Sequence, residues 1–170
     1  MFVSRCTNTQ NKKIVLLRPK RLGHIVLRVR DLGGSQKFYY GILGLKVMEI
    51  IPDQMIFLSA AGDSSHELAL VSVGESALGP DPSQVGLYHF AWEMHSFEDL
   101  QAMYFKLQQE GVRIAGVGDH GISLGVYIFD PDGNEIELFY ELPREDWPEH
   151  HMFGGKFPRK LEDETEVESV

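Results

Sequence analysis

The chain has 170 residues, of which 43% are hydrophobic and 24% charged, and its formal net charge is -9. This length accommodates one domain with a sizeable core, or two small modules that share one. The acidic balance argues against nucleic acid as a partner, and no apolar run approaches the roughly 18 residues of a membrane span. Cys6 is the only cysteine, which excludes an intrachain disulfide and fits a reducing compartment. The N-terminus lacks the uninterrupted apolar segment of a secretory signal, so we expect a cytoplasmic location.

The first half of the chain predicts a strand, a helix and three further strands. Residues 1–19 read as a leader with one short strand at 14–17, and a strand is predicted at 22–29. Asp31 is a plausible cap for a helix over 35–45. Short apolar runs at 46–51, 55–60 and 66–73, separated by turn-forming residues, predict three strands.

The same order returns in the second half. After a Gly/Pro/Ser-rich linker at 75–85, a strand is predicted at 87–94, and Ser96 with Asp99 forms a capping box for a helix that ends at Gly111. Strands follow at 112–117, 125–130 and 134–140. The sequence DPDG, from Asp130 to Gly133, joins the last two in a pattern typical of a type I turn.

These two halves form an internal repeat. His24 and His89 are 65 positions apart, and so are Tyr39 and Tyr104. The repeat predicts an α+β fold in which two βαβββ modules, 20–74 and 86–142, are paired in one domain around a concave cavity. Residues 143–170 form a C-terminal extension.

The extension has two parts of different composition. Its last ten residues hold five of the 25 acidic residues and no basic one, which predicts a disordered acidic tail. The preceding segment contains Trp147, Met152, Phe153 and Phe157 and is too apolar for a free tail. It could fold over the cavity mouth or form an oligomer interface.

Alternation along the strands selects three side chains that could bind a metal. Phe90 and Trp92 share one face of their strand, which leaves His89 on the opposite face. Glu137 is set against its apolar neighbours in the same way, and His24, which shares its face with Val26 and Arg28, shows a weaker version of this split. Two histidines and one carboxylate form a facial set that suits non-haem Fe(II) and leaves coordination positions open.

The chain resembles the vicinal oxygen chelate superfamily, which includes glyoxalase I, fosfomycin- and bleomycin-resistance proteins and type I extradiol ring-cleavage dioxygenases. The resemblance covers residues 22–140. It is sharpest toward the dioxygenases, whose pattern is matched by Gly118, His120, Val126, Tyr127, Asp130, Pro131, Gly133 and Glu137.

This resemblance implies roles for six residues. His24, His89 and Glu137 would bind iron, while His120 and Tyr127 would hydrogen-bond the substrate and its oxygenated intermediates. His66 matches the acid/base histidine of these dioxygenases, although alternation leaves open whether His66 or Glu67 points into the cavity.

The function implied is Fe(II)-dependent cleavage of a catechol-type ring with O2. The partners would be a small aromatic diol and O2, without nucleic acid or membrane, in a chain that could form a homo-oligomer. Two alternatives stay open. One is an isomerase or thiol transferase of the glyoxalase or fosfomycin type using Mn, Zn or Ni, and the other is a drug-binding resistance protein that needs no metal.

Overall fold

The computed structural model describes residues 18–150 and 153–162, and it consists of two βαβββ modules. The first module contains β1 (Ile25–Val29), α1 (Leu32–Gln36), the π-helical segment η1 (Lys37–Ile42), β2 (Lys46–Ile51), β3 (Met55–Ser59) and β4 (Leu68–Ser72). The second contains β5 (His89–Glu93), α2 (Phe97–Gln109), β6 (Ile114–Asp119), β7 (Ser123–Phe129) and β8 (Glu135–Glu141), and is followed by a 3₁₀ turn, η2 (Arg144–Asp146). The predicted paired-module fold is therefore confirmed.

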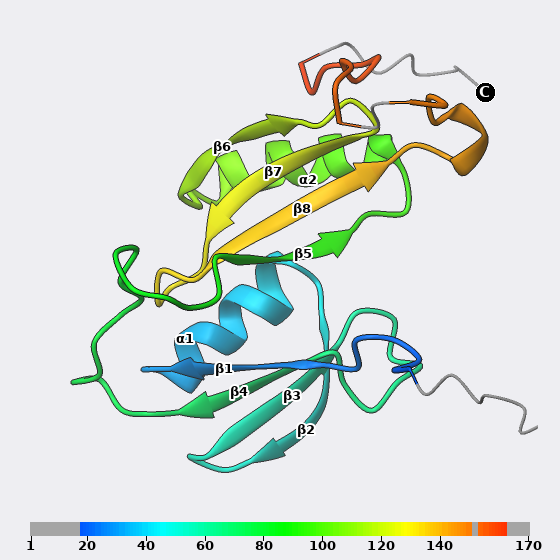
Figure 1. Ribbon diagram of the computed structural model, residues 1–170. Coiled ribbons are helices and arrows are strands. Elements are labelled where there is room, and N and C mark those ends of the chain that lie inside the picture. Colours follow the sequence, from blue (N-terminus) through cyan, green and yellow to red (C-terminus); the bar gives the residue numbers. More distant parts are fainter. Residues whose placement is uncertain (1–17, 151–152, 163–170) are drawn as a thin grey trace, which may run out of the picture.

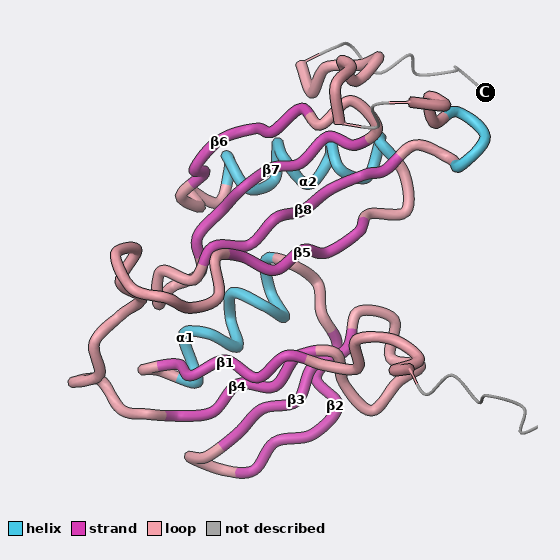
Figure 2. Tube along the Cα trace, in the orientation of Figure 1, coloured by secondary structure: helices cyan, strands magenta, loops and turns pink. Residues whose placement is uncertain are grey.

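Each module forms a mixed four-stranded sheet of the same topology. The strand orders are β1-β4-β3-β2 and β5-β8-β7-β6, with the first and fourth strands of each module parallel and the other pairs antiparallel. The first strand of each module is consequently an edge strand. Figure 1 shows that β1 and β5 are the edges that face each other, with α1 between them in this view. In Figure 2, α2 lies along one face of the second sheet.

Local sequence signals set the helix ends. The Asp31 side chain accepts a 2.9 Å hydrogen bond from the Gly33 N–H, and the Ser96 hydroxyl accepts one of 3.0 Å from the Asp99 N–H. Both caps were predicted. Gly111 follows the end of α2 with a positive φ of 67°, the left-handed conformation that glycine adopts without steric cost.

The hydrophobic core lies on the helix-facing side of each sheet. Leu27 and Val29 in β1 are buried, as are Phe90 in β5 and Leu138 in β8. Residues between them point to the other face, which is open in the first sheet, where Val26 is exposed. The candidate ligands therefore lie on the face opposite the core, as alternation predicted for β5 and β8.

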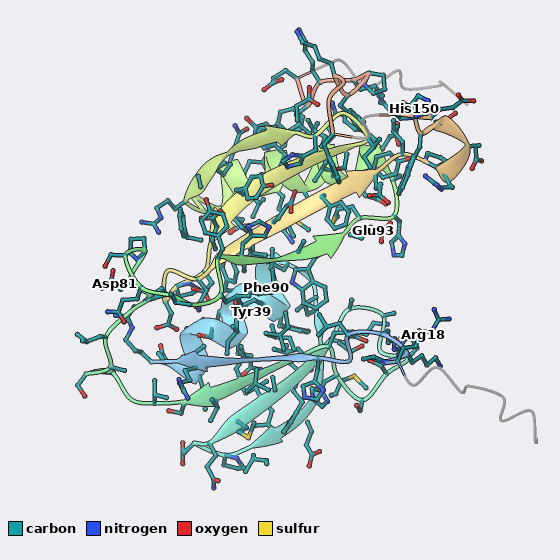
Figure 3. The ribbon with its side chains drawn as sticks, viewed as in Figure 1. Arg18, Tyr39, Asp81, Phe90, Glu93 and His150 are labelled. Carbon is teal, nitrogen blue, oxygen red and sulfur yellow. The ribbon has the colours of Figure 1, made fainter. Side chains whose placement is uncertain are left out.

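The DPDG turn connects the two modules as well as joining β7 to β8. Its backbone closes with a 3.1 Å hydrogen bond from the Gly133 N–H to the Asp130 carbonyl. The Asp130 side chain accepts a 2.8 Å hydrogen bond from the Tyr39 hydroxyl, and Asp132 accepts one of 2.6 Å from Arg30 Nε. Tyr39 and Phe90 lie where the modules meet (Figure 3). Both aspartates of the turn thus bind the first module.

Several strand boundaries differ from the sequence-based expectation. β4 begins at Leu68 rather than at residue 66, and the Glu67 side chain accepts hydrogen bonds from Ser64 and Ala60 in the loop that precedes it. β6 has the predicted length but is shifted by two residues toward the C-terminus, β7 is one residue longer than predicted, and the two strands enclose a tight turn at His120. The strand expected at 14–17 and residues 163–170 of the acidic tail lie outside the described residues, while Leu161, the first residue of that predicted tail, is buried. In the part that is described, no helix is long and apolar enough to cross a membrane.

Candidate metal and catalytic site

Four of the predicted site residues meet on the face of the second sheet opposite α2. Glu137 lies on β8, between β5 and β7 in the sheet, and it is buried. Its neighbours Ile136 and Leu138 point into the core and are 0% and 2% exposed, so the strand pleat turns the carboxylate the other way. Tyr127 pairs with Glu137 in the β7–β8 register, and His120 occupies the turn between β6 and β7.

A chain of hydrogen bonds connects His120 to Glu137 through Tyr127. The Tyr127 hydroxyl donates to Glu137 Oε1 at 3.0 Å, and His120 Nε2 lies 2.9 Å from the same hydroxyl. Because the phenol has one hydrogen and donates it to Glu137, His120 must donate its Nε2–H to the phenolic oxygen. The geometry therefore selects the Nε2–H tautomer of His120 and orients the carboxylate of Glu137.

The Tyr127 phenol is held in its protonated form. Burial raises the pKa of Tyr127 above its usual value, and the hydrogen bond to the Glu137 carboxylate raises the pKa further. Tyr127 consequently remains a hydrogen-bond donor throughout the neutral range.

His89 and Glu137 present two potential ligand atoms to the same point. His89 Nε2 lies 3.4 Å from Glu137 Oε2, the oxygen that Tyr127 does not bind. Two ligand atoms each about 2.1 Å from a divalent metal, at octahedral to tetrahedral angles, lie about 3.0 to 3.4 Å apart. This pair therefore fits two positions of a metal coordination shell. The other ring nitrogen of His89, Nδ1, is buried without a hydrogen-bond partner among the described residues.

Gly118 and Gly125 have no side chain, and this leaves room for the side chains of the site. A Cβ at Gly125 would lie 2.1 Å from Glu137 Oε1, and one at Gly118 would lie 2.7 Å from Tyr127 Cε2 and 3.0 Å from His120 Nε2. Gly118 belongs to the pattern recognised in the sequence. Gly125 was missed, although a glycine inside a strand, two residues before Tyr127, is a signal of close approach by another group.

The remaining two predicted residues, His24 and His66, meet each other on the first module. Their ring centroids are 4.5 Å apart, and the His66 ring also contacts Phe57 edge-on at 5.1 Å. The Glu67 carboxylate is instead engaged by the Ala60 N–H at 3.0 Å and by the Ser64 hydroxyl. His66 therefore contacts His24, whereas Glu67 lines the cavity between β1 and β5, so the acid/base role of His66 stays a prediction.

The structure does not bring His24 into the His89–Glu137 pair. Within residues 18–150 and 153–162, no three His, Cys, Asp or Glu side chains are grouped to hold a metal ion. A cavity of about 170 Å³ lies between the two edge strands, lined by His24 and Ile25 on one side and by Ala91 on the other. Ala91 is paired with Glu137 in the β5–β8 register, so this cavity adjoins the strand pair that carries the candidate ligands.

Sequence comparison agrees with this fold. Residues 21–138 match the Glyoxalase/Bleomycin resistance protein/Dioxygenase superfamily. The chain therefore belongs to that superfamily.

The chain is similar to two dioxygenases and to one solved structure of the same superfamily. The chain is 35% identical over 127 residues to a catechol-2,3-dioxygenase of Bacillus subtilis, covering 74% of this chain and 43% of the relative. It is 33% identical over 120 residues to a biphenyl-2,3-diol 1,2-dioxygenase of Rhodococcus globerulus, covering 69% and 62%. It thus spans roughly half the length of these two relatives. A glyoxalase/dioxygenase structure from Nostoc punctiforme has a TM-score of 0.62 at 23% identity, covering 76% of this chain and 98% of that one.

Proposed function

We propose that this protein is an Fe(II)-dependent extradiol dioxygenase that cleaves a catechol-type aromatic ring with O2. The observation that carries the proposal is the hydrogen-bonded chain from His120 through Tyr127 to Glu137, with His89 beside the free carboxylate oxygen. The two dioxygenase relatives, which act on catechol and biphenyl-2,3-diol by name, support the same reaction class.

The proposed metal ligands are His89, Glu137 and His24. The first two already present donor atoms at a suitable spacing, and His24 lines the cavity between the edge strands. His24 would have to leave its ring contact with His66 to complete the set. When bound, Fe(II) would supply open coordination positions for the two catechol oxygens and for O2.

The chain's own residues perform three tasks in this proposal. Tyr127 fixes the Glu137 carboxylate through Oε1, which keeps Oε2 turned toward His89. His120, held as the Nε2–H tautomer, donates its one N–H to Tyr127, so its Nδ1 is left to accept a hydrogen bond from a substrate hydroxyl. His66 exchanges protons with the substrate, a role that typically accelerates a reaction by 10² to 10⁴.

An oxygen-electrode assay tests the proposed reaction. Protein purified anaerobically and loaded with Fe(II) should consume one O2 for each catechol and form a yellow ring-fission product. A panel of catechols with apolar, acidic and no ring substituents should include at least one substrate. The absence of O2 uptake across the whole panel would contradict the proposal.

The same protein preparation distinguishes the alternative enzyme class. A glyoxalase-type isomerase or fosfomycin-type transferase would be active with Zn(II), Ni(II) or Mn(II) and would consume no O2. Activity toward a hemithioacetal or an epoxide under nitrogen would therefore favour that class. Stoichiometric ligand binding without metal or turnover would instead favour a drug-binding protein.

A further inference from the structure

The C-terminal strap, residues 153–162, is anchored on α2. Phe157 is buried, with its ring stacked on Phe97 at 5.7 Å and edge-on to Tyr140 at 6.3 Å. Leu161 is 2% exposed, and its carbonyl accepts a 2.7 Å hydrogen bond from Gln101 Nε2. In Figure 1 this orange-to-red segment lies near the end of α2 where the helix begins. Several independent contacts therefore hold the strap on the second module.

The side chain of Arg159 also holds the strap against α2. The Arg159 guanidinium lies 3.9 Å from the centroid of the Phe97 ring and pairs with the Glu98 carboxylate. The hydrogen bond from Arg159 lowers the pKa of Glu98, although this exposed pair contributes little to the free energy of folding. Burial of Phe157 and Leu161 accounts for most of the anchoring.

Asp119 connects the anchored strap to the turn that carries His120. Its Oδ1 accepts two hydrogen bonds, one from the Gly121 N–H and one from the Phe157 N–H, each 2.9 Å long. His120 stands between Asp119 and Gly121 in the chain. Gly155 also lies near Gly121, since a Cβ at Gly155 would lie 3.9 Å from the Gly121 Cα. The strap is thus hydrogen-bonded to the turn through the Asp119 side chain.

The orientation of the His120 ring depends on the position of the turn that carries it. Its side chain is 41% exposed, and the turn closes with backbone hydrogen bonds from the His120 N–H to Ser123 and from the Ile122 N–H to His120. A half-exposed ring on a short turn loses orientation when its backbone moves. The 2.9 Å contact between His120 Nε2 and Tyr127 depends on that orientation.

We propose that Asp119 is a positioning residue, which uses the strap as a fixed support to orient His120 toward Tyr127 and the substrate. This inference rests on the proposed function and adds to it a role for the C-terminal extension. Asp119 touches neither the substrate nor Glu137 in this role. Its effect passes through the backbone on both sides of His120.

Two substitutions of Asp119 test whether this residue connects the strap to His120. Asp119→Ala removes the acceptor of both hydrogen bonds, whereas Asp119→Asn keeps an oxygen that can accept them. We expect Asp119→Ala to lower kcat by about tenfold or more with a smaller change in KM, because misplacing a catalytic group by about 1 Å can cost up to 10² in rate. Asp119→Asn should restore kcat to within about twofold. Equal activity of both variants and the original protein would overturn the proposal.

A spectroscopic readout separates this inference from the proposed reaction. In the metal-free protein at fixed pH, ¹⁵N chemical shifts of the His120 ring, assigned with His120→Gln, should report the Nε2–H tautomer. They should be unchanged in Asp119→Asn and averaged toward a mixture of tautomers in Asp119→Ala. Unaltered shifts in Asp119→Ala would refute the positioning role. If the protein cleaves no catechol, these shifts still decide the role of Asp119.

Two further variants supply the controls. Asp81 caps a loop in the same way, accepting a 2.8 Å hydrogen bond from the Ser83 N–H, so Asp81→Ala should leave the His120 shifts unchanged. Phe157→Leu keeps an apolar side chain but removes the ring contacts with Phe97 and Tyr140. It should shift the His120 signals in the same direction as Asp119→Ala. No shift in Phe157→Leu would show that the strap provides no support.

Discussion

The hydroxyl of Tyr39 donates a 2.8 Å hydrogen bond to Oδ2 of Asp130, which lies 91 positions later in the chain and in the other module. Tyr39 is completely buried, and Asp130 also accepts hydrogen bonds from the backbone N–H groups of Asp132 and Asn134. This contact fixes the DPDG turn against the first module. Since the turn joins the strands that carry Tyr127 and Glu137, the contact also supports the candidate site.

Removing the Tyr39 hydroxyl should destabilise the protein. Tyr39→Phe leaves Asp130 buried with one hydrogen bond fewer, which should lower the free energy of unfolding by about 1 to 3 kcal/mol. Urea unfolding followed by circular dichroism measures the change. Tyr104→Phe, at the equivalent position of the repeat and only partly buried, should change stability by less than about 0.5 kcal/mol. Equal losses in the two variants would contradict this role for Tyr39.

The same tyrosine should make the protein sensitive to alkaline pH. Burial raises the pKa of Tyr39 above its ordinary value of about 10, and Asp130 raises the pKa further. The folded protein then binds a proton that the unfolded chain releases. The resulting stability is fully present below pH about 10 and is lost as pH rises above it, by about 1.4 kcal/mol per pH unit. Unfolding at pH 9, 10 and 11 should show this loss in the original protein and a shallower one in Tyr39→Phe.

The space left by Gly125 should be required for metal binding. A Cβ there would meet Glu137 Oε1 at 2.1 Å, so Gly125→Ala must displace the carboxylate. Displacing a ligand or its support typically costs about 10- to 100-fold in metal affinity. Fe(II) affinity can be measured anaerobically by competition with a chromogenic chelator. Gly116→Ala is the control, because a Cβ at Gly116 meets nothing within 4 Å, and an equal effect there would argue against this explanation.

Substitution of a proposed ligand and substitution of the proposed acid/base residue should have different effects on iron content and turnover. His89→Ala should lose bound iron, while His66→Phe should retain iron and reduce turnover by about 10² to 10⁴. Iron content and kcat are measured on the same preparations. His95→Ala, which removes an exposed histidine, should alter neither. Full iron content in His89→Ala, or full turnover in His66→Phe, would remove that residue from its proposed role.

Local sequence patterns were sufficient to predict the architecture. The order of elements, both helix caps and the β7–β8 hairpin follow from periodicity and turn chemistry, which act over a few residues. The repeat of His24 and Tyr39 at His89 and Tyr104 indicated that the same unit occurs twice. Alternation also placed His89 and Glu137 on the face opposite the core. These features are determined by residues that are close together in the sequence, so they can be predicted from the sequence alone.

Contacts between distant residues were decided only by the tertiary structure. The patterns could not show that Asp130 and Asp132 bind Tyr39 and Arg30, because alternation gives the face of a side chain but not its partner across the module boundary. The clearance at Gly125 depends on the register between β7 and β8.

The orientation of His66 and the docking of the strap were also decided by contacts between residues that are distant in the sequence. His66 contacts His24 while Glu67 is hydrogen-bonded to the loop before β4, and Phe157 is buried between Phe97 and Tyr140. By itself the sequence determined which residues are available for the site and which face of a strand each occupies. The packing of the two modules and the strap decided which of them meet, because those distances depend on how separate surfaces fit together.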